Sequence, residues 1–184
     1  MLQTVYLDHN ATTPIHPDLR AKVAEWLEVW GNPSSIHWAG RGPKALLREA
    51  RTSVARLLGV ESLELIFTSG GSEANNLAIQ GVCSLVPSAP GERNQIIIST
   101  VEHPSVRKTV EALRARGYRM DLIPVNREGQ LDLTALANLL SERTALVSVM
   151  LANNETGHIF PVAEVARMAR AVGALAHCDA VQAL

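Results

Sequence analysis

The chain has 184 residues, of which 47% are hydrophobic and 19% are charged, and its formal net charge is −1. This composition is typical of a globular protein with one substantial core, and the lack of a Lys/Arg cluster argues against a nucleic-acid partner and favours a small molecule. The amino terminus has no basic region followed by an apolar core, and no apolar run reaches membrane-spanning length, so we expect a cytoplasmic protein without a membrane partner.

A loop and two helices are predicted for residues 1–60. Residues 8–14 are mostly polar or turn-forming, which predicts a loop. Apolar residues then recur at helical spacing from Pro17 to about Trp30, and again from about Gly42 to Leu58, where Gly59 ends the second helix. We expect each helix to bury an apolar face and residues 1–60 to form an N-terminal segment that packs onto the rest.

Residues 61–184 alternate between predicted strands and predicted helices. The strand-like runs are residues 63–67, 96–100, 119–125, 145–150 and 174–178, and helices begin near Ser72, Pro104, Asp132 and Pro161. Helices that separate near-continuous apolar strands indicate right-handed crossovers and a mostly parallel sheet. The sequence therefore predicts an α/β fold with three layers, α/β/α.

A glycine-rich junction joins the first predicted strand to the helix that follows it. Two glycines, Gly70 and Gly71, allow close approach of a ligand, and the hydroxyls of Thr68, Ser69 and Ser72 add donors next to the free amides of the helix. The junction predicts a phosphate cup for a small phosphorylated cofactor, because it matches neither the P-loop nor the dinucleotide glycine spacing. The simpler interpretation is a strand-to-helix turn with Ser72 as the N-cap.

Neither cysteine belongs to a recognisable metal or disulfide pattern. Cys83 and Cys178 lie far apart and outside any metal-ligand spacing, so we expect no metal site and interpret both as buried thiols.

Polar side chains follow several of the predicted strands. His103 follows residues 96–100, Asn153 and Asn154 follow residues 145–150, and Asp179 and Gln182 follow residues 174–178. The carboxyl ends of parallel strands lie along one edge, where ligands bind. Taken singly, His103 or Asp179 could cap a helix and the asparagines could form a turn, but their coincidence with the cup along one edge favours a binding site.

Pyridoxal phosphate is a cofactor that needs this whole set together. It requires a phosphate cup, a carboxylate at its pyridine nitrogen, a flat group against its ring and polar contacts to its phenolic oxygen. Asp179 can supply the carboxylate, His103 the flat group, and Asn154 and Gln182 the polar contacts.

With these residues assembled, the chain resembles the cysteine desulfurases, the NifS/IscS-like branch of the class V aminotransferase family with the type I pyridoxal-phosphate fold. The resemblance covers essentially all 184 residues. It is carried by residues 6–14 (YLDHNATTP), 31–35 (GNPSS), 67–73 (FTSGGSE), 102–103 (EH), 153–157 (NNETG) and 177–182 (HCDAVQ).

The resemblance implies a role for each of these residues. Gly71 and Ser72 correspond to phosphate binders, His103 to the ring-stacking acid/base, Asn154 and Gln182 to partners of the phenolic oxygen, and Asp179 to the partner of the pyridine nitrogen. Asn10, Ala11 and Thr12 correspond to part of the substrate mouth.

The implied reaction removes sulfur from L-cysteine, giving alanine and an enzyme persulfide for iron–sulfur cluster or thio-cofactor assembly. Implied partners are a sulfur acceptor or scaffold protein, and the complete enzyme is expected to be a homodimer.

Two catalytic parts of the family are not recognised in the chain. The family carries its Schiff-base lysine in a Ser-x-His-Lys segment beyond the aspartate strand, followed by a cysteine loop. The lysines here are Lys22, Lys44 and Lys108, none in that context. We therefore expect the amino-terminal half of an enzyme, a truncated large domain that is inactive alone. Alternatives are a selenocysteine lyase, a cysteine-sulfinate desulfinase or a non-catalytic binding fragment.

Overall fold

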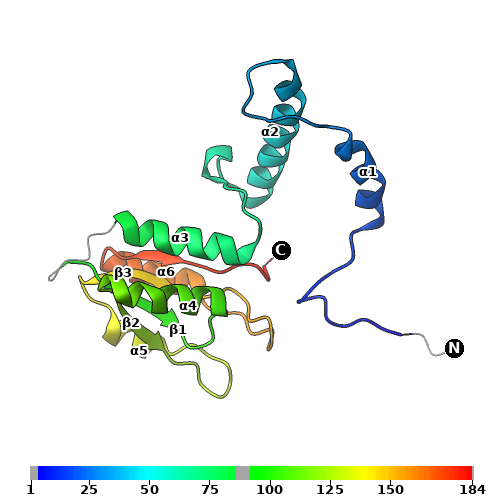
Figure 1. Cartoon of the computed structure of the whole chain (residues 1–184). Helices are drawn as coiled ribbons and strands as arrows, with labels where there is room; N and C mark the ends of the chain where they lie inside the picture. Colours follow the sequence, from blue (N-terminus) through cyan, green and yellow to red (C-terminus); the bar gives the residue numbers. More distant parts are fainter. Residues whose placement is uncertain (1–3, 86–91, 184) are drawn as a thin grey trace. The chain divides into compact units, whose positions relative to one another are not determined.

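The structure is a computed structural model that describes residues 4–85 and 92–183, and the chain divides into two compact units, residues 1–67 and 68–184. The first unit contains α1 (Pro17–Leu27), α2 (Trp38–Leu58) and the short 3₁₀ helix η1 (Ser62–Glu64) (Figure 1). The second unit contains the remaining helices and every strand of the described residues. Each unit is described below by itself.

The two predicted helices of the first unit are confirmed, with shifted ends. Pro17 occupies the first turn of α1, and the His16 side chain caps it by accepting from Asp18 N at 3.3 Å. Gly59 ends α2 in the left-handed conformation, with φ of 69°. The expectation that each helix buries an apolar face is wrong for this unit, because the large apolar residues of both stripes are mostly exposed and α1 buries none of its residues.

The predicted strand at residues 63–67 is wrong. Residues 62–64 form η1, in which the Glu61 and Glu64 side chains satisfy each other's backbone amides. Residues 65–67 are not in a strand, and Arg51 Nη1 donates to Leu65 O. An apolar run becomes a strand only where a neighbouring strand accepts its backbone hydrogen bonds, and no described strand lies beside this run.

The second unit is built on a four-stranded parallel sheet. Its strands are β1 (Gln95–Ser99), β2 (Arg119–Ile123), β3 (Thr144–Ser148) and β4 (Leu175–His177), in the order β2-β1-β3-β4. β1 pairs with β2 from Gln95↔Arg119 to Ser99↔Ile123, and β3 pairs with β4 from Leu146↔Leu175 to Ser148↔His177. The four remaining predicted strands are therefore confirmed, with small shifts of their ends.

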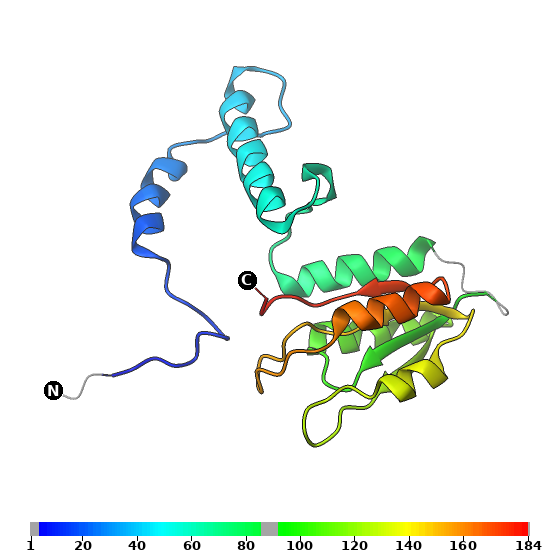
Figure 2. The same cartoon turned by 180° about the vertical axis from the view of Figure 1, so that it is seen from behind.

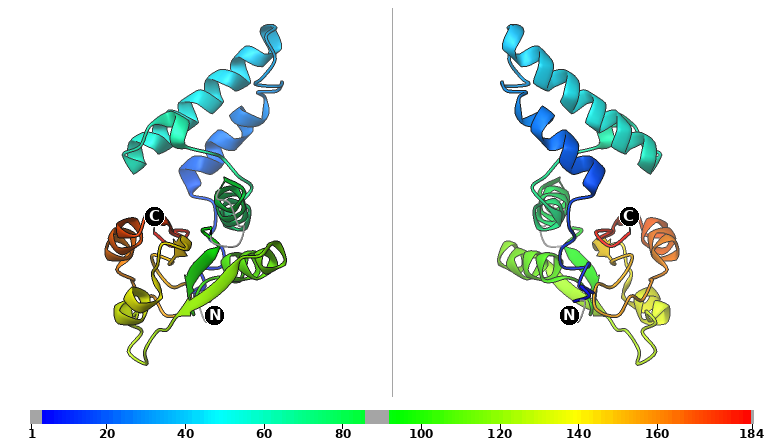
Figure 3. Two further views of the ribbon diagram at one scale, coloured as in Figure 1. Left: turned by 90° about the vertical axis from the view of Figure 1, so that its left-hand side faces the viewer. Right: turned by 90° about the vertical axis from the view of Figure 1, so that its right-hand side faces the viewer.

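Helices cover both faces of this sheet. The helices are α3 (Gly71–Leu85), α4 (Pro104–Leu113, continued by the 3₁₀ turn η2, Arg114–Arg116), α5 (Leu133–Leu139) and α6 (Val162–Ala171). Alternate residues of β1 point to opposite faces: Ile96 and Ile98 pack in a cluster with residues of α3 and α4, whereas Ile97 packs with residues of α5 and α6. Figures 2 and 3 show α5 and α6 on one side of the strands and α3 and α4 on the other. The three-layer α/β/α fold is confirmed.

Local capping explains where these helices begin. Asp132 Oδ1 accepts from Ala135 N at 2.8 Å and starts α5, while Pro104 stands at the first position of α4. Gly117 and Gly173 follow helices with φ of 90° and 72°, a conformation that favours glycine. Among the described residues, no helix is both long enough and apolar enough to span a bilayer.

Candidate functional site

The predicted phosphate cup lies at the start of α3. Ala74 N donates to Gly70 O at 3.0 Å and makes the first helical hydrogen bond, so the amides of residues 71–73 have no acceptor within the helix. The hydroxyls of Thr68 and Ser69 are already bonded, to Gly70 O and to the Glu73 carboxylate. The Ser72 hydroxyl, the third predicted donor, makes no hydrogen bond within the described residues and can therefore donate to a ligand.

Gly71 lies directly against the segment that follows β4. A Cβ atom at position 71 would come within 2.6 Å of Val181 Cγ2, whereas a Cβ at Gly70 would meet nothing within 4 Å. Gly71 is thus required for close packing, and this packing places the start of α3 beside the residues that follow Asp179.

Asp179 is buried, with 8% of its surface exposed, and both of its carboxylate oxygens accept hydrogen bonds. Oδ2 accepts from Asn75 Nδ2 at 2.8 Å, and Oδ1 accepts from Val181 N at 3.1 Å. Asn75 belongs to α3 and is also buried. The phosphate cup and the predicted carboxylate are therefore linked by a direct contact between α3 and the end of β4.

His103 begins α4 as its N-cap. Its Nδ1 accepts from Ser105 N at 3.1 Å and lies 2.7 Å from Ser105 Oγ, so the capping interpretation describes this side chain correctly. The ring is exposed, which leaves its faces available for a ligand. Capping through Nδ1 and contact with a cofactor through the ring face are compatible.

Glu102, immediately before His103, is a buried carboxyl that the residue pattern alone did not single out. Its Oε1 accepts from Ser99 Oγ at 2.6 Å and from Met150 N at 2.9 Å, while its buried Oε2 has no hydrogen-bond partner in the described residues. The pKa of Glu102 is raised to about 7, because burial and, to a smaller extent, the charge of Asp179 raise it by more than the Ser99 and Met150 donors lower it. Glu102 joins the ends of β1 and β3 beneath the site.

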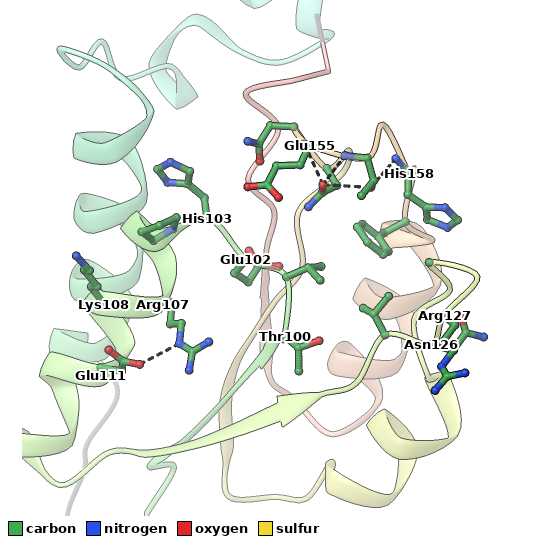
Figure 4. Close-up of a pocket in the computed structure, with 18 residues that line it drawn as sticks. Thr100, Glu102, His103, Arg107, Lys108, Glu111, Asn126, Arg127, Glu155 and His158 are labelled. Carbon is green, nitrogen blue, oxygen red and sulfur yellow. Dashed lines mark hydrogen bonds and ion pairs between the residues drawn. The ribbon is translucent and has the colours of Figure 1, made fainter. Parts of the chain in front are cut away.

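A cavity of about 850 Å³ opens beside His103 at the carboxyl ends of the strands (Figure 4). Its lining includes Glu102, His103, Lys108 and the turn at residues 153–156. In that turn Asn153 Oδ1 accepts from Glu155 N at 3.0 Å and from Thr156 N at 2.9 Å, as the Asx-turn interpretation predicts. A smaller cavity of about 390 Å³ lies between α3 and α4 and is lined by both Ser72 and His103.

The structure brings together five of the predicted cofactor residues. Gly71, Ser72, His103 and Asp179 are connected through the contacts above, and Asn154 shares the larger cavity with His103. Gln182 follows Val181 in the same segment and is partly buried. None of these positions tests the assigned roles, which stay predictions.

The predicted substrate residues Asn10, Ala11 and Thr12 lie in the first unit, in an exposed turn. Ala11 N and Thr12 N both donate to Asp8 O, at 3.2 and 3.3 Å, and Tyr6 donates its hydroxyl proton to the same oxygen. These hydrogen bonds close the turn, and its role at the substrate mouth stays a prediction.

The two cysteines differ in exposure. Cys83 is buried on α3, as predicted, but the prediction of a buried Cys178 is wrong, because this residue is exposed just after β4 ends at His177. Although the residue as a whole is exposed, partial desolvation of its thiol, together with the charges of Glu102 and Asp179, raises the pKa of Cys178. The neighbouring His177 Nδ1 lies 2.8 Å from Ser148 Oγ, and burial lowers the pKa of His177 against the opposing effect of the Asp179 charge.

Comparison with known proteins places these features in a family context. The profile of the family described as Aminotransferase class-V matches residues 5–184. A curated relative from Cereibacter sphaeroides, named cysteine desulfurase, is 46% identical over 100% of this chain and 47% of its own length. The chain spans about half the length of the curated relatives it matches.

The chain also matches about half the length of similar solved structures. A structure titled NifS-like protein superposes with a TM-score of 0.91 at 35% identity, covering 99% of this chain and 50% of that one. A structure titled SspA in complex with cysteine has a TM-score of 0.89 at 28% identity, covering 98% of this chain and 51% of that one.

Proposed function

The chain belongs to the class-V aminotransferase family, and from this premise we propose that it is the cofactor-binding, amino-terminal half of a pyridoxal-phosphate-dependent cysteine desulfurase. The observation that carries the proposal is the joining of the phosphate cup to a buried carboxylate. Asn75 of α3 donates to Asp179, and Gly71 at the start of α3 packs against Val181. A site for this cofactor needs an anion-binding helix start and a carboxylate in one place.

The residues at the strand ends fit the cofactor. The amides of the first turn of α3, which have no acceptor within the helix, would hold its phosphate together with the Ser72 hydroxyl, and Asp179 would hold a proton on its pyridine nitrogen. When bound, pyridoxal phosphate supplies an electron-withdrawing ring that stabilises negative charge developing on the substrate. A carboxylate whose two oxygens already accept N–H donors suits this task, because it needs no proton of its own.

The remaining predicted residues take complementary roles. The exposed ring of His103 would lie against the cofactor, and Asn154 and Gln182 would donate to its phenolic oxygen. Asn10, Ala11 and Thr12 would line the substrate mouth, so we assign residues 1–60 to substrate access and packing and residues 61–184 to the partial cofactor-binding domain.

L-Cysteine is the proposed substrate. The curated relative above is named cysteine desulfurase, and one similar structure is titled as a complex with cysteine. The products would be alanine and a persulfide on the complete enzyme, passed to a sulfur-acceptor or scaffold protein for iron–sulfur cluster or thio-cofactor assembly. We further propose that the complete enzyme is a cytoplasmic homodimer.

Sulfide release from L-cysteine tests the proposal. In the presence of pyridoxal phosphate, the assay compares the chain by itself with the chain combined with the carboxyl-terminal portion of the Cereibacter sphaeroides relative. L-Selenocysteine and L-cysteine sulfinate are added as competing substrates. We expect no turnover by the chain alone, because Lys22, Lys44 and Lys108 all lie on helices outside the family's lysine segment, and sulfide with alanine from the combination. Preference for a competing substrate would favour a lyase or desulfinase, and cofactor binding without turnover would favour a non-catalytic fragment.

A further inference from the structure

A hydrogen-bonded chain of four side chains connects Asp179 to His103. Asn75 Nδ2 lies 2.8 Å from Asp179 Oδ2 and 2.9 Å from Ser105 Oγ, and Ser105 Oγ lies 2.7 Å from His103 Nδ1. Asn75 is only 5% exposed. These hydrogen bonds run from the end of β4 through α3 to the start of α4, and the function proposed above assigns neither Asn75 nor Ser105 a task toward the cofactor.

The chemistry of the donors fixes the direction of this chain. The side-chain amide of Asn75 has two N–H groups, and each is used, one on a carboxylate and one on a hydroxyl. Since Ser105 Oγ accepts from Asn75, its own proton is available for His103 Nδ1. The donors therefore run outward from Asn75 in both directions.

The same geometry determines the tautomer of neutral His103. Ser105 N donates to Nδ1 at 3.1 Å, and a backbone amide can only donate, so Nδ1 carries no proton. The neutral ring consequently holds its proton on Nε2, on the side that is not engaged in capping. Protonation of Nδ1 would break the hydrogen bond from Ser105 N and reverse the direction of the one with Ser105 Oγ, because the hydroxyl oxygen can also accept.

We propose that Asn75 is a positioning residue that sets the Asp179 carboxylate and, through Ser105, the His103 imidazole as one unit. This inference rests on the proposed function, since it gives Asn75 a task only if Asp179 and His103 meet the cofactor. Asn75 occupies the buried face of α3 together with Ile79 and Cys83, where an apolar residue would pack without the cost of burying an amide. The two hydrogen bonds offset that cost.

Several titratable groups lie near Asp179 and influence its electrostatic environment. Glu102 follows β1, His177 lies on β4, and Cys178 directly precedes Asp179, and each of them interacts electrostatically with Asp179. Substitution of Asn75 changes a donor but none of these groups. Its effect on the carboxyl resonance of Asp179, measured at a fixed pH, is therefore separable from theirs.

The test uses NMR on the cofactor-free 184-residue chain. At a fixed pH of 7, the Asn75 side-chain N–H resonances of the wild type should differ from those of Asp179→Asn, because the carboxylate that accepts from Asn75 is replaced by an amide. In Asn75→Ala and in the similarly sized Asn75→Leu, the carboxyl-carbon resonance of Asp179 should move at a fixed pH of 7, because a donor to this carboxylate is lost. The Nδ1 resonance of His103 should also move. Asn94→Ala is the matched control, since Asn94 precedes β1 at the opposite edge of the sheet and donates to Gly117 O.

Ligand binding provides the second readout. Pyridoxine 5′-phosphate, which has no aldehyde to react with lysines, should bind Asn75→Ala roughly 10- to 100-fold more weakly than wild type, as expected for one hydrogen bond to a charged group. Absence of binding by the wild type would contradict the proposed function. The NMR measurements would still show whether Asn75 links Asp179 to Ser105 and His103. Asn75 side-chain N–H resonances that are the same in the wild type and in Asp179→Asn would overturn the inference, even if both Asn75 variants failed to fold. Unchanged Asp179 and His103 signals in a folded variant would overturn it as well.

Discussion

Glu102 is a single residue whose ionisation couples the site to the stability of the fold. Its pKa is raised from 4.5 to about 7, first by burial and further by the charge of Asp179, against the opposing effect of the Ser99 and Met150 donors. The folded state therefore binds more protons than the unfolded state between these two pH values. The stability linked to protonated Glu102 is fully present below about pH 4.5 and is lost as the pH rises through about 7.

Glu102→Gln should remove this pH dependence while keeping an oxygen for Ser99 and Met150 N. Between pH 5 and pH 8 the wild type should lose up to about 3 kcal/mol of unfolding free energy relative to the variant, from about 1.4 kcal/mol per unit of pKa difference. Urea unfolding of both proteins at the two pH values measures the difference, and the comparison cancels other titrating groups such as His177. A difference between the proteins that is the same at both pH values would contradict the assignment.

His103 has two separable functions at the residue scale. As the N-cap of α4, its loss should cost about 1 kcal/mol of stability. As the proposed ring-stacking group, its loss should lower turnover of the completed enzyme by roughly 10²- to 10⁴-fold. His103→Asn, in which a good capping residue is kept, should therefore melt near the wild-type temperature and still be nearly inactive. A melting point that falls while the rate per folded molecule holds would leave capping as the only function.

At the scale of elements, the contact between the start of α3 and the segment after β4 holds the site together. Gly71→Ala would push a methyl group against Val181 Cγ2, at 2.6 Å before relaxation, and should destabilise the second unit by about 1–3 kcal/mol and weaken phosphate binding. Gly70→Ala is the matched control and should be nearly neutral, because its Cβ meets nothing within 4 Å. The double variant Gly71→Ala/Val181→Ala should recover most of the loss in thermal unfolding. Equal effects of the two glycine substitutions would show that the contact is unimportant.

Elements with strong local signals could be predicted from the sequence. The four strands of the sheet are short runs bounded by turns, and α4 and α5 begin at the Pro104 and Asp132 signals. Residues 63–67 carry the same apolar signal but form no strand, because strand formation depends on a partner that no local pattern reveals. The helical periodicity of α1 and α2 likewise predicts helices correctly without showing what covers their apolar faces.

The chemistry of the site was only partly predictable for the same reason. His103, Asn154 and Asp179 are recognisable because they follow strands, whereas Asn75 lies inside a helix and meets Asp179 from 104 positions away. A signal for Asn75 did exist: it shares its helix face with Ile79 and Cys83, so a polar residue stands at an apolar position. Glu102 gave no comparable signal, because a glutamate after a strand is ordinarily solvated.

At the scale of the whole molecule, the first unit exposes many large apolar side chains. Ile36 is 98% exposed, Leu63 95% and Leu7 85%, and many other large apolar residues of this unit are exposed too. We expect the purified 184-residue chain to self-associate and to melt with low cooperativity. Light scattering across a concentration series, combined with calorimetry, measures both properties. A monodisperse, cooperatively melting monomer would contradict this expectation.

The central claim, that the second unit holds pyridoxal phosphate by its phosphate and its pyridine nitrogen, is tested most directly by isothermal titration of the chain with pyridoxine 5′-phosphate. Pyridoxine without the phosphate serves as the ligand control, and Asp18→Asn, at an exposed position of α1, serves as the control for Asp179→Asn. We expect one site per chain, binding at least about 10-fold weaker without the phosphate, and a comparable loss of affinity in Asp179→Asn but not in Asp18→Asn. Equal affinity for the two ligands, or wild-type affinity in Asp179→Asn, would contradict it.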